Sequence, residues 1–113
     1  MRSRIRGKIS IDDLKKKMDS GEDIQIVDVR GRECCYDLGH IPGAVSIPLN
    51  EFEERAPREL DRERPVIVYC GSVSCTLSPR AAHLLSDNMG FADVSDYAGG
   101  IKEWQDTGSE VEK

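Results

Sequence analysis

The chain lacks the long apolar segments and the excess of positive charge that mark several large classes of protein. None of its apolar stretches approaches the roughly 20 residues needed to span a bilayer, so the 113-residue sequence predicts no membrane association. No apolar segment follows residues 1–4, which argues against a secretory signal and for a cytoplasmic location. A net charge of −5 argues against wholesale nucleic-acid binding.

The length and composition predict one soluble globular domain with a real core. Hydrophobic residues make up 38% of the chain and charged residues 33%. We expect a basic, flexible amino terminus over residues 1–8, a domain over residues 9–108 and a tail over residues 109–113. Four cysteines without an export signal indicate reduced thiols rather than a permanent disulfide scaffold.

Strands and helices are expected to alternate along the chain. Ser10, Asn50 and Ser78 are the expected helix caps, and Pro57 is expected to end or interrupt the second helix. The alternation predicts an α/β domain with a mainly parallel sheet and helices on both faces. In such sheets ligands bind beyond the carboxyl ends of the strands. The expected strands are 24–29, 44–47, 66–69 and 92–97, and the expected helices follow residues 10, 48, 78 and 100.

Cys70 stands where such a sheet would place a reactive group. It follows the apolar strand 66–69 and precedes a loop of small polar residues and a helix. Unpaired N–H groups and the dipole at a helix start favour negative charge, so this position suits a nucleophilic thiolate. The alternative is a buried cysteine that ends a core strand as a small hydrophobe. The local pattern leaves both open.

Short motifs occur in order along the chain: Asp28-Val29-Arg30, Gly39-His40-Ile41-Pro42-Gly43-Ala44, Tyr69-Cys70, Gly90-Phe91 and Gly99-Gly100-Ile101-Lys102-Glu103-Trp104. Together they resemble a single-domain rhodanese. The resemblance implies that a persulfide on Cys70 carries sulfane sulfur from a donor to a thiol or protein acceptor, with no cofactor and no metal. It implies supporting roles for Asp28 and Arg30, which brace loops. His40 lies in the segment Gly-His-Ile-Pro-Gly, and we expect its ring to hydrogen-bond backbone and fix the turn rather than to act as an acid or base.

The loop after Cys70 departs from the usual rhodanese pattern in its charge. Its backbone N–H groups are expected to hold the persulfide as an anion nest does. The family commonly has an Arg or Lys close behind the cysteine, whereas residues 71–79 here carry no charge. Arg80 is the next residue, and its side chain either reaches back to the loop or lies at the surface. A loop without a cation predicts weak selection for the thiosulfate dianion, so polysulfides and thiol or protein persulfides are better candidate donors. The expected loop residues are Gly71, Ser72, Val73, Ser74, Cys75, Thr76 and Leu77.

The same loop is about two residues longer than usual and contains Cys75, giving the spacing C-x4-C. This resembles a subset of rhodanese-like proteins with paired cysteines in the loop. As a resolving thiol, Cys75 would attack the Cys70 persulfide, release sulfide and leave a disulfide. The protein would then be a persulfide, polysulfide or arsenate reductase. Alternatively Cys75 only occupies the loop.

Two further functions compete with sulfur transfer. A non-catalytic sulfur-carrier or interaction module is one, although the retained Cys70 argues against an inactive version. A phosphatase-like activity is the other, and Thr76 disfavours it because that chemistry needs an arginine six residues after the cysteine. The role of Cys34 and Cys35 stays open. Their adjacent spacing argues against a zinc site built from these two residues with Cys70 and Cys75.

Overall fold

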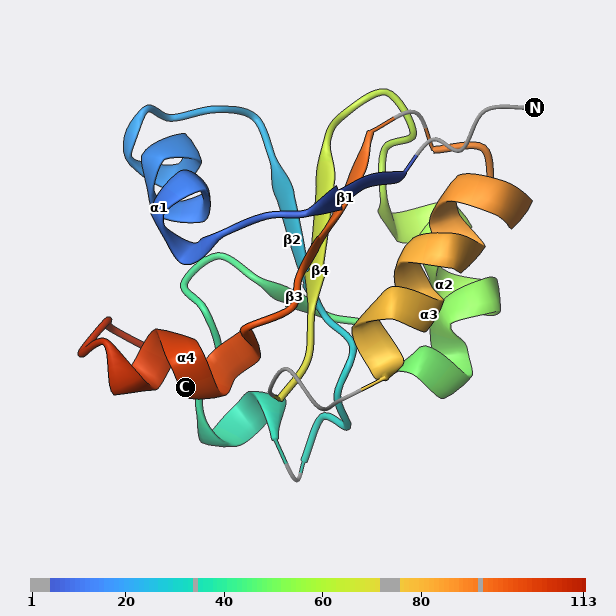
Figure 1. Cartoon of the computed structure of the whole chain (residues 1–113). Coiled ribbons are helices and arrows are strands. Elements are labelled where there is room, and N and C mark those ends of the chain that lie inside the picture. The colour runs from blue at the N-terminus through green and yellow to red at the C-terminus, as the bar shows by residue number, and fades with distance from the viewer. Residues whose placement is uncertain (1–4, 34, 72–75, 92) are drawn as a thin grey trace.

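A computed structural model describes residues 5–33, 35–71, 76–91 and 93–113 of the chain. The structure is a five-stranded, all-parallel sheet between two layers of helices (Figure 1). The predicted α/β class with helices on both faces is confirmed. The strands are β1 (Ile5–Lys8), β2 (Gln25–Asp28), β3 (Val45–Ser46), β4 (Val66–Tyr69) and β5 (Val94–Tyr97), in the spatial order β1-β5-β4-β2-β3.

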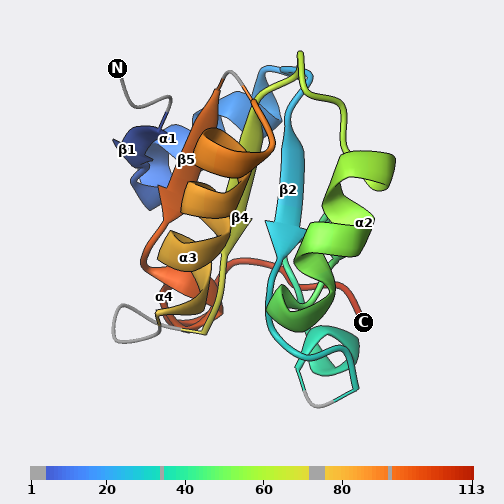
Figure 2. The same ribbon diagram turned by 90° about the vertical axis from the view of Figure 1, so that its right-hand side faces the viewer.

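The helices divide between the two faces of the sheet. On one face lie α1 (Ile11–Asp19) and α4 (Gly100–Asp106), and on the other lie α2 (Phe52–Glu59) and α3 (Leu77–His83) (Figures 1 and 2). Three shorter segments join them: the 3₁₀ turns η1 (Tyr36–Leu38) and η2 (Leu49–Glu51), and the π-helical η3 (Leu84–Asn88), which continues α3. Within the described ranges, no helix is long and apolar enough to cross a membrane.

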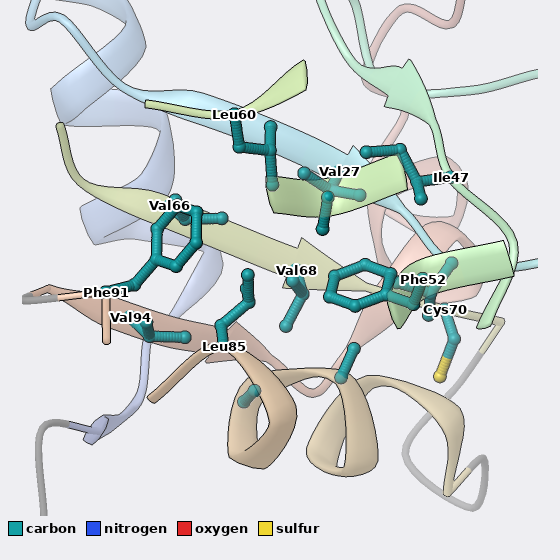
Figure 3. Close-up of a cluster of buried hydrophobic side chains, with 14 residues drawn as sticks. Val27, Ile47, Phe52, Leu60, Val66, Val68, Cys70, Leu85, Phe91 and Val94 are labelled. Carbon is teal, nitrogen blue, oxygen red and sulfur yellow. The ribbon is translucent and has the colours of Figure 1, made fainter. Parts of the chain in front are cut away.

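The strand β4 lies in the middle of the sheet, between β5 and β2, and its four residues are all buried. Val66, Val68 and Cys70 belong to the apolar cluster under α2 and α3, whereas Ile67 and Tyr69 belong to the cluster under α1 and α4. This follows from the two-residue side-chain period of a strand. Figure 3 shows Cys70 at the end of the first cluster near Phe52.

Of the three expected caps, Ser10 is confirmed. Its Oγ accepts a hydrogen bond from the Asp13 N–H at 3.1 Å. The cap expected at Asn50 is wrong, because this residue lies inside η2 and α2 begins only at Phe52. Pro57 does not end α2, which continues to Glu59. Pro57 removes one N–H donor from α2, but the Leu60 N–H still closes the last turn on the Ala56 carbonyl at 3.0 Å.

Both ends of the described chain pair with the domain. Residues 5–8 form the edge strand β1 beside β5, although no strand was expected there. The sequence Ile-Arg-Gly-Lys has a single apolar residue, and its pairing is made by backbone groups. At the other end, Glu112 exchanges two backbone hydrogen bonds of 2.9 Å with His40. The carboxyl-terminal residues therefore return to the loop that follows β2.

Candidate functional site

Cys70 is the first residue after β4, at the carboxyl edge of the sheet, and is 1% exposed. Its Sγ donates a hydrogen bond to the Ser78 Oγ at 3.4 Å. Its carbonyl accepts from the Ile101 N–H at 3.0 Å, and the Gly71 carbonyl accepts from the Lys102 N–H at 2.9 Å. These donors come from the first turn of α4, where helical N–H groups have no partner within the helix. The start of α4 therefore fixes the backbone of Cys70.

Gly100 makes this close approach between α4 and Cys70 sterically feasible. Its φ is +67°, and a Cβ atom added there would lie 2.5 Å from the Cys70 carbonyl oxygen. Only glycine combines that left-handed conformation with the missing side chain. The sequence predicted no such role for Gly100, which was expected only as part of a motif before the last helix. The glycine doublet directly after a strand was the available signal.

Ser78 is a partner of Cys70 rather than the expected helix cap. The helix α3 begins at Leu77, so Ser78 lies inside its first turn and is 1% exposed. Pro79 follows it within the first turn, where its missing N–H costs no helical hydrogen bond. The cap prediction used the Ser-Pro pair alone and was wrong by two residues. Ser78 is therefore buried, with its hydroxyl against the Cys70 sulfur.

Asp96 is a second buried polar residue on this face of the sheet. It lies on β5 opposite Val68 of β4 and is 5% exposed. Burial raises the pKa of its carboxyl group, against the effects of a hydrogen bond from Ser78 and of the positive charge of Lys8. Its Oδ1 has no hydrogen-bond partner within the described part of the chain. The sequence predicted a strand at Asp96 and no role for its side chain, although a carboxylate within a core strand was an available signal.

On the opposite face of the same sheet edge, Asp28 and Arg30 form a saturated polar cluster with Tyr69. Asp28 is fully buried and accepts from the Arg30 guanidinium at 2.6, 3.0 and 3.1 Å and from the Tyr69 hydroxyl at 2.9 Å. Burial acts against the charge of Arg30, but the hydrogen bond and the charge of Asp28 outweigh it, so the pKa of Arg30 is raised.

This cluster ties the loop after β2 to β4. The Arg30 Nη2 donates to the Gly39 carbonyl at 2.9 Å, and the Ile41 N–H donates to the Tyr69 hydroxyl at 3.1 Å. Burial, followed by the charge of Asp28, raises the pKa of Tyr69 far above its ordinary value, so its hydroxyl stays protonated. Asp28 and Arg30 thus connect the loop after β2 to Tyr69, the residue that precedes Cys70. Their bracing role stays a prediction.

His40 has the turn-fixing contacts expected from its place in the loop. It is 6% exposed, its Nδ1 lies 3.0 Å from the Tyr36 carbonyl oxygen, and its ring stacks on the Tyr36 ring at 3.8 Å. Its Nε2 lies 3.6 Å from a Glu112 carboxylate oxygen. The imidazole is thus held between the loop and the carboxyl-terminal segment.

The remaining predicted site residues are only partly placed. Ser72, Val73, Ser74 and Cys75 lie outside the described residues, as does Cys34. Of the rest of the expected loop, Gly71 and Leu77 are half-buried and Thr76 is exposed.

Two residues near the expected site have other surroundings. Arg80 is exposed and lines a cleft between α2 and α3 with Glu53, His83 and Asp87. Cys35 is half-buried and contributes to the electrostatic environment of Arg30. No group of three metal-binding side chains occurs within the described ranges.

Comparison with known protein families agrees with this geometry. The family model described as "Rhodanese-like domain" matches residues 10–107. The chain belongs to the rhodanese-like family. A crystal structure of the BH2092 protein from Bacillus halodurans has this fold, with a TM-score of 0.85 and 36% identity, covering 93% of this chain and 75% of that one.

Two of the curated relatives have names that describe different functions. The "Putative sulfur carrier protein YrkF" of Bacillus subtilis is 38% identical over 96 residues, which are 85% of this chain and 49% of that protein. The "HTH-type transcriptional regulator Rv0324" of Mycobacterium tuberculosis is 34% identical over 101 residues, or 89% of this chain and 42% of that protein. This rhodanese-like chain thus spans about half the length of these relatives.

Proposed function

We propose that this rhodanese-like protein is a sulfurtransferase that carries sulfane sulfur as a persulfide on Cys70 and passes it to a thiophilic acceptor. The main support is the position of Cys70. This residue directly follows the central strand β4, its backbone is fixed by α4 and its Sγ is hydrogen-bonded to Ser78. Family membership supports a sulfur-transfer context, as does the name of the sulfur-carrier relative.

The proposed chemistry has two displacement steps. The Cys70 thiolate attacks the outer sulfur of the donor, a Cys70 S–S bond forms, and the donor leaves as a thiolate or shortened polysulfide anion. The acceptor thiolate then attacks the outer sulfur of the persulfide, and Cys70 leaves as a thiolate. No electron carrier is needed, because the sulfane sulfur keeps its oxidation state while it changes partners. Catalysis thus depends on how well the site holds an anionic sulfur.

We further propose that the donor is a polysulfide or a thiol-bound persulfide and that the acceptor is a cytoplasmic thiol or protein. The uncharged sequence from Gly71 to Pro79 supports this preference over thiosulfate. A dianion desolvated in a buried site needs a compensating cation. Arg80, the next cation along the chain, has an exposed side chain beside α2. Competition between polysulfide and thiosulfate for the same protein tests the preference directly.

The test of the main proposal is the mass of the protein after treatment with polysulfide. Peptide mapping of the wild-type chain should show an added mass of about 32 Da, one sulfur atom, on the Cys70 peptide. A Cys70→Ser variant should lose both this adduct and sulfur transfer to cyanide or a thiol, and Cys35→Ser is the matched cysteine control. Sulfur transfer at the wild-type rate by the Cys70→Ser variant would rule the proposal out. An adduct without transfer would favour a carrier module.

We also propose Cys75 as a resolving thiol, which would make the protein a paired-cysteine rhodanese able to act as a persulfide reductase. The C-x4-C spacing supports this second candidate. The expected signature is sulfide release with a Cys70–Cys75 disulfide in the wild-type peptide map. A Cys75→Ala variant should retain the Cys70 adduct and stop releasing sulfide. Unchanged sulfide release from that variant, with a thiol reductant present, would leave only the transferase.

A further inference from the structure

Three buried side chains on one face of the sheet edge form a continuous chain of polar contacts. Cys70 at the end of β4, Ser78 in the first turn of α3 and Asp96 on β5 are each at most 5% exposed. The Cys70 Sγ donates to the Ser78 Oγ at 3.4 Å. Ser78 in turn is hydrogen-bonded to the Asp96 carboxyl group. The Ser78 hydroxyl therefore connects the candidate nucleophile to a buried acid.

The register of the sheet brings Asp96 to this position. In the parallel pairing of β4 with β5, Asp96 stands beside Val68, whose side chain belongs to the core cluster under α3. Side chains at paired positions project from the same face of a sheet, so Asp96 projects toward α3, as Val68 and Cys70 do. Its Oδ1 has no hydrogen-bond partner within the described ranges. Buried polar atoms without a partner are rare and costly in proteins, which argues for a role.

We propose that Asp96 accepts the proton of Cys70 through Ser78, so that the three side chains form a proton relay. The proposal deepens the sulfur-transfer function and rests on it for the identity of the nucleophile. Ser78 touches the reacting sulfur, whereas Asp96 acts through Ser78 as a positioning residue. Neither residue would need to contact the sulfur donor.

The relay conserves protons and charge. In the resting arrangement the Cys70 thiol donates to Ser78, and the Ser78 hydroxyl donates to the Asp96 carboxylate. On activation the thiol proton moves to the Ser78 Oγ while the original Ser78 proton moves to the carboxylate. The result is a Cys70 thiolate, an unchanged serine whose hydroxyl now points at the sulfur, and a neutral Asp96. When Cys70 is released as a thiolate in the second step of transfer, the same movements can run in reverse.

The surroundings of Asp96 suit a group that exchanges a proton. Ser78 faces it from α3, the apolar Val68 lies beside it on β4, and the charge of Lys8 acts on it from β1. Burial favours the neutral acid, whereas the hydroxyl and the ammonium favour the carboxylate. Each protonation state of the carboxyl group is therefore favoured by part of its surroundings.

The pH dependence of Cys70 alkylation by iodoacetamide, followed by peptide mapping, tests the relay without any sulfur donor. Because a coupled pair loses its protons in two steps, the wild-type rate should rise in two steps separated by a plateau. Asp96→Asn, which keeps the side-chain volume, should show one step and a loss of about tenfold near pH 6, the factor given by one pKa unit. An Asn variant with the wild-type two-step profile would overturn the relay.

Variants of Ser78 provide a second, independent readout. Ser78→Ala should also give a single step, Ser78→Thr should restore two steps because it keeps the hydroxyl, and the buried Ser86→Ala should leave the profile unchanged. If Ser78→Ala retained two steps, Asp96 would not act through Ser78 and the proposal would fail. A relay confirmed by alkylation but with no sulfur adduct on Cys70 would instead refute the proposed transferase, so the two failures are distinguishable.

Discussion

Two buried polar clusters lie on opposite faces of the sheet edge, one on each side of the end of β4. The Asp28 cluster is saturated: its carboxylate accepts hydrogen bonds from Arg30 and Tyr69. The Asp96 cluster is not, because the Asp96 Oδ1 is unpartnered within the described ranges and the Ser78 hydroxyl is its donor. Two aspartates with similar burial thus have different surroundings on the two strands that flank β4.

The difference shows how neighbouring residues of one strand can serve stability and chemistry separately. Tyr69 projects into the saturated cluster and Cys70 into the open one, because successive side chains of a strand point to opposite faces. A saturated ion pair resists changes in protonation and holds loops in place. An incompletely satisfied network can rearrange its protons. Variants on the two faces should therefore have effects of different kinds.

The largest expected effect is on stability and comes from the saturated face. Asp28→Asn leaves the Arg30 guanidinium, 13% exposed, without its carboxylate. Breaking a buried pair in this way costs about 3 kcal/mol or more, so urea unfolding should show a loss of that size. Asp37→Asn, which breaks the exposed pair with Arg32, should cost less than about 1 kcal/mol. Equal losses in the two variants would remove the distinction between bracing and surface pairs.

A somewhat smaller effect is expected at the junction between the two clusters. Gly100→Ala places a Cβ atom 2.5 Å from the Cys70 carbonyl oxygen, whereas Gly90→Ala meets nothing within 4 Å at a similar φ of +74°. Both variants bear the cost of a left-handed alanine, about 1–2 kcal/mol. Only Gly100→Ala adds overpacking, roughly 1–3 kcal/mol more, and only it should slow persulfide formation on Cys70. Thermal unfolding and the rate of persulfide formation should be measured for both variants. Equal losses of stability and equal rates of persulfide formation would contradict this prediction.

Local patterns were sufficient to predict the sheet but not the contacts around Cys70. The apolar runs before Asp28 and Cys70 predicted β2 and β4, because a strand buried on both faces needs continuous hydrophobic residues. The edge strand β1 has no such pattern and depends on backbone pairing with β5. Propensity therefore identified β2 to β5, including the edge strand β3, and missed only β1 at the other edge of the described sheet.

The partners of Cys70 come from distant segments. Ser78, Asp96 and Gly100 reach the site only through the packing of α3, β5 and α4 around β4. Each has a plausible local interpretation, as a helix cap, a strand residue and a glycine before the last helix, and none of these interpretations indicates a shared location. By contrast, Asp28 and Arg30 are two residues apart, so the motif itself predicted that they would act together.

The smallest expected effect is a dependence of the free energy of unfolding on pH that comes from Asp96. Burial raises the pKa of Asp96 in the folded protein above its unfolded value, so the native state binds more protons there than the unfolded state. Stability from this group is therefore complete below the unfolded pKa and is lost as the pH rises through the folded pKa. Asp96→Asn removes that dependence. Relative to the wild type, the variant should therefore become more stable as the pH rises above the unfolded pKa of an aspartate, about 3.9.

Urea unfolding of both proteins at several pH values measures this difference. Ser78→Ala should act in the opposite direction, because the Ser78 hydroxyl lowers the pKa of Asp96 and its removal lets burial raise that pKa further. Its loss of stability should therefore grow as the pH rises, and the double variant with Asp96→Asn should show no such growth. Parallel pH curves for the wild type and Asp96→Asn would mean that Asp96 does not change protonation in this range. The open cluster would then be as inert as the saturated one.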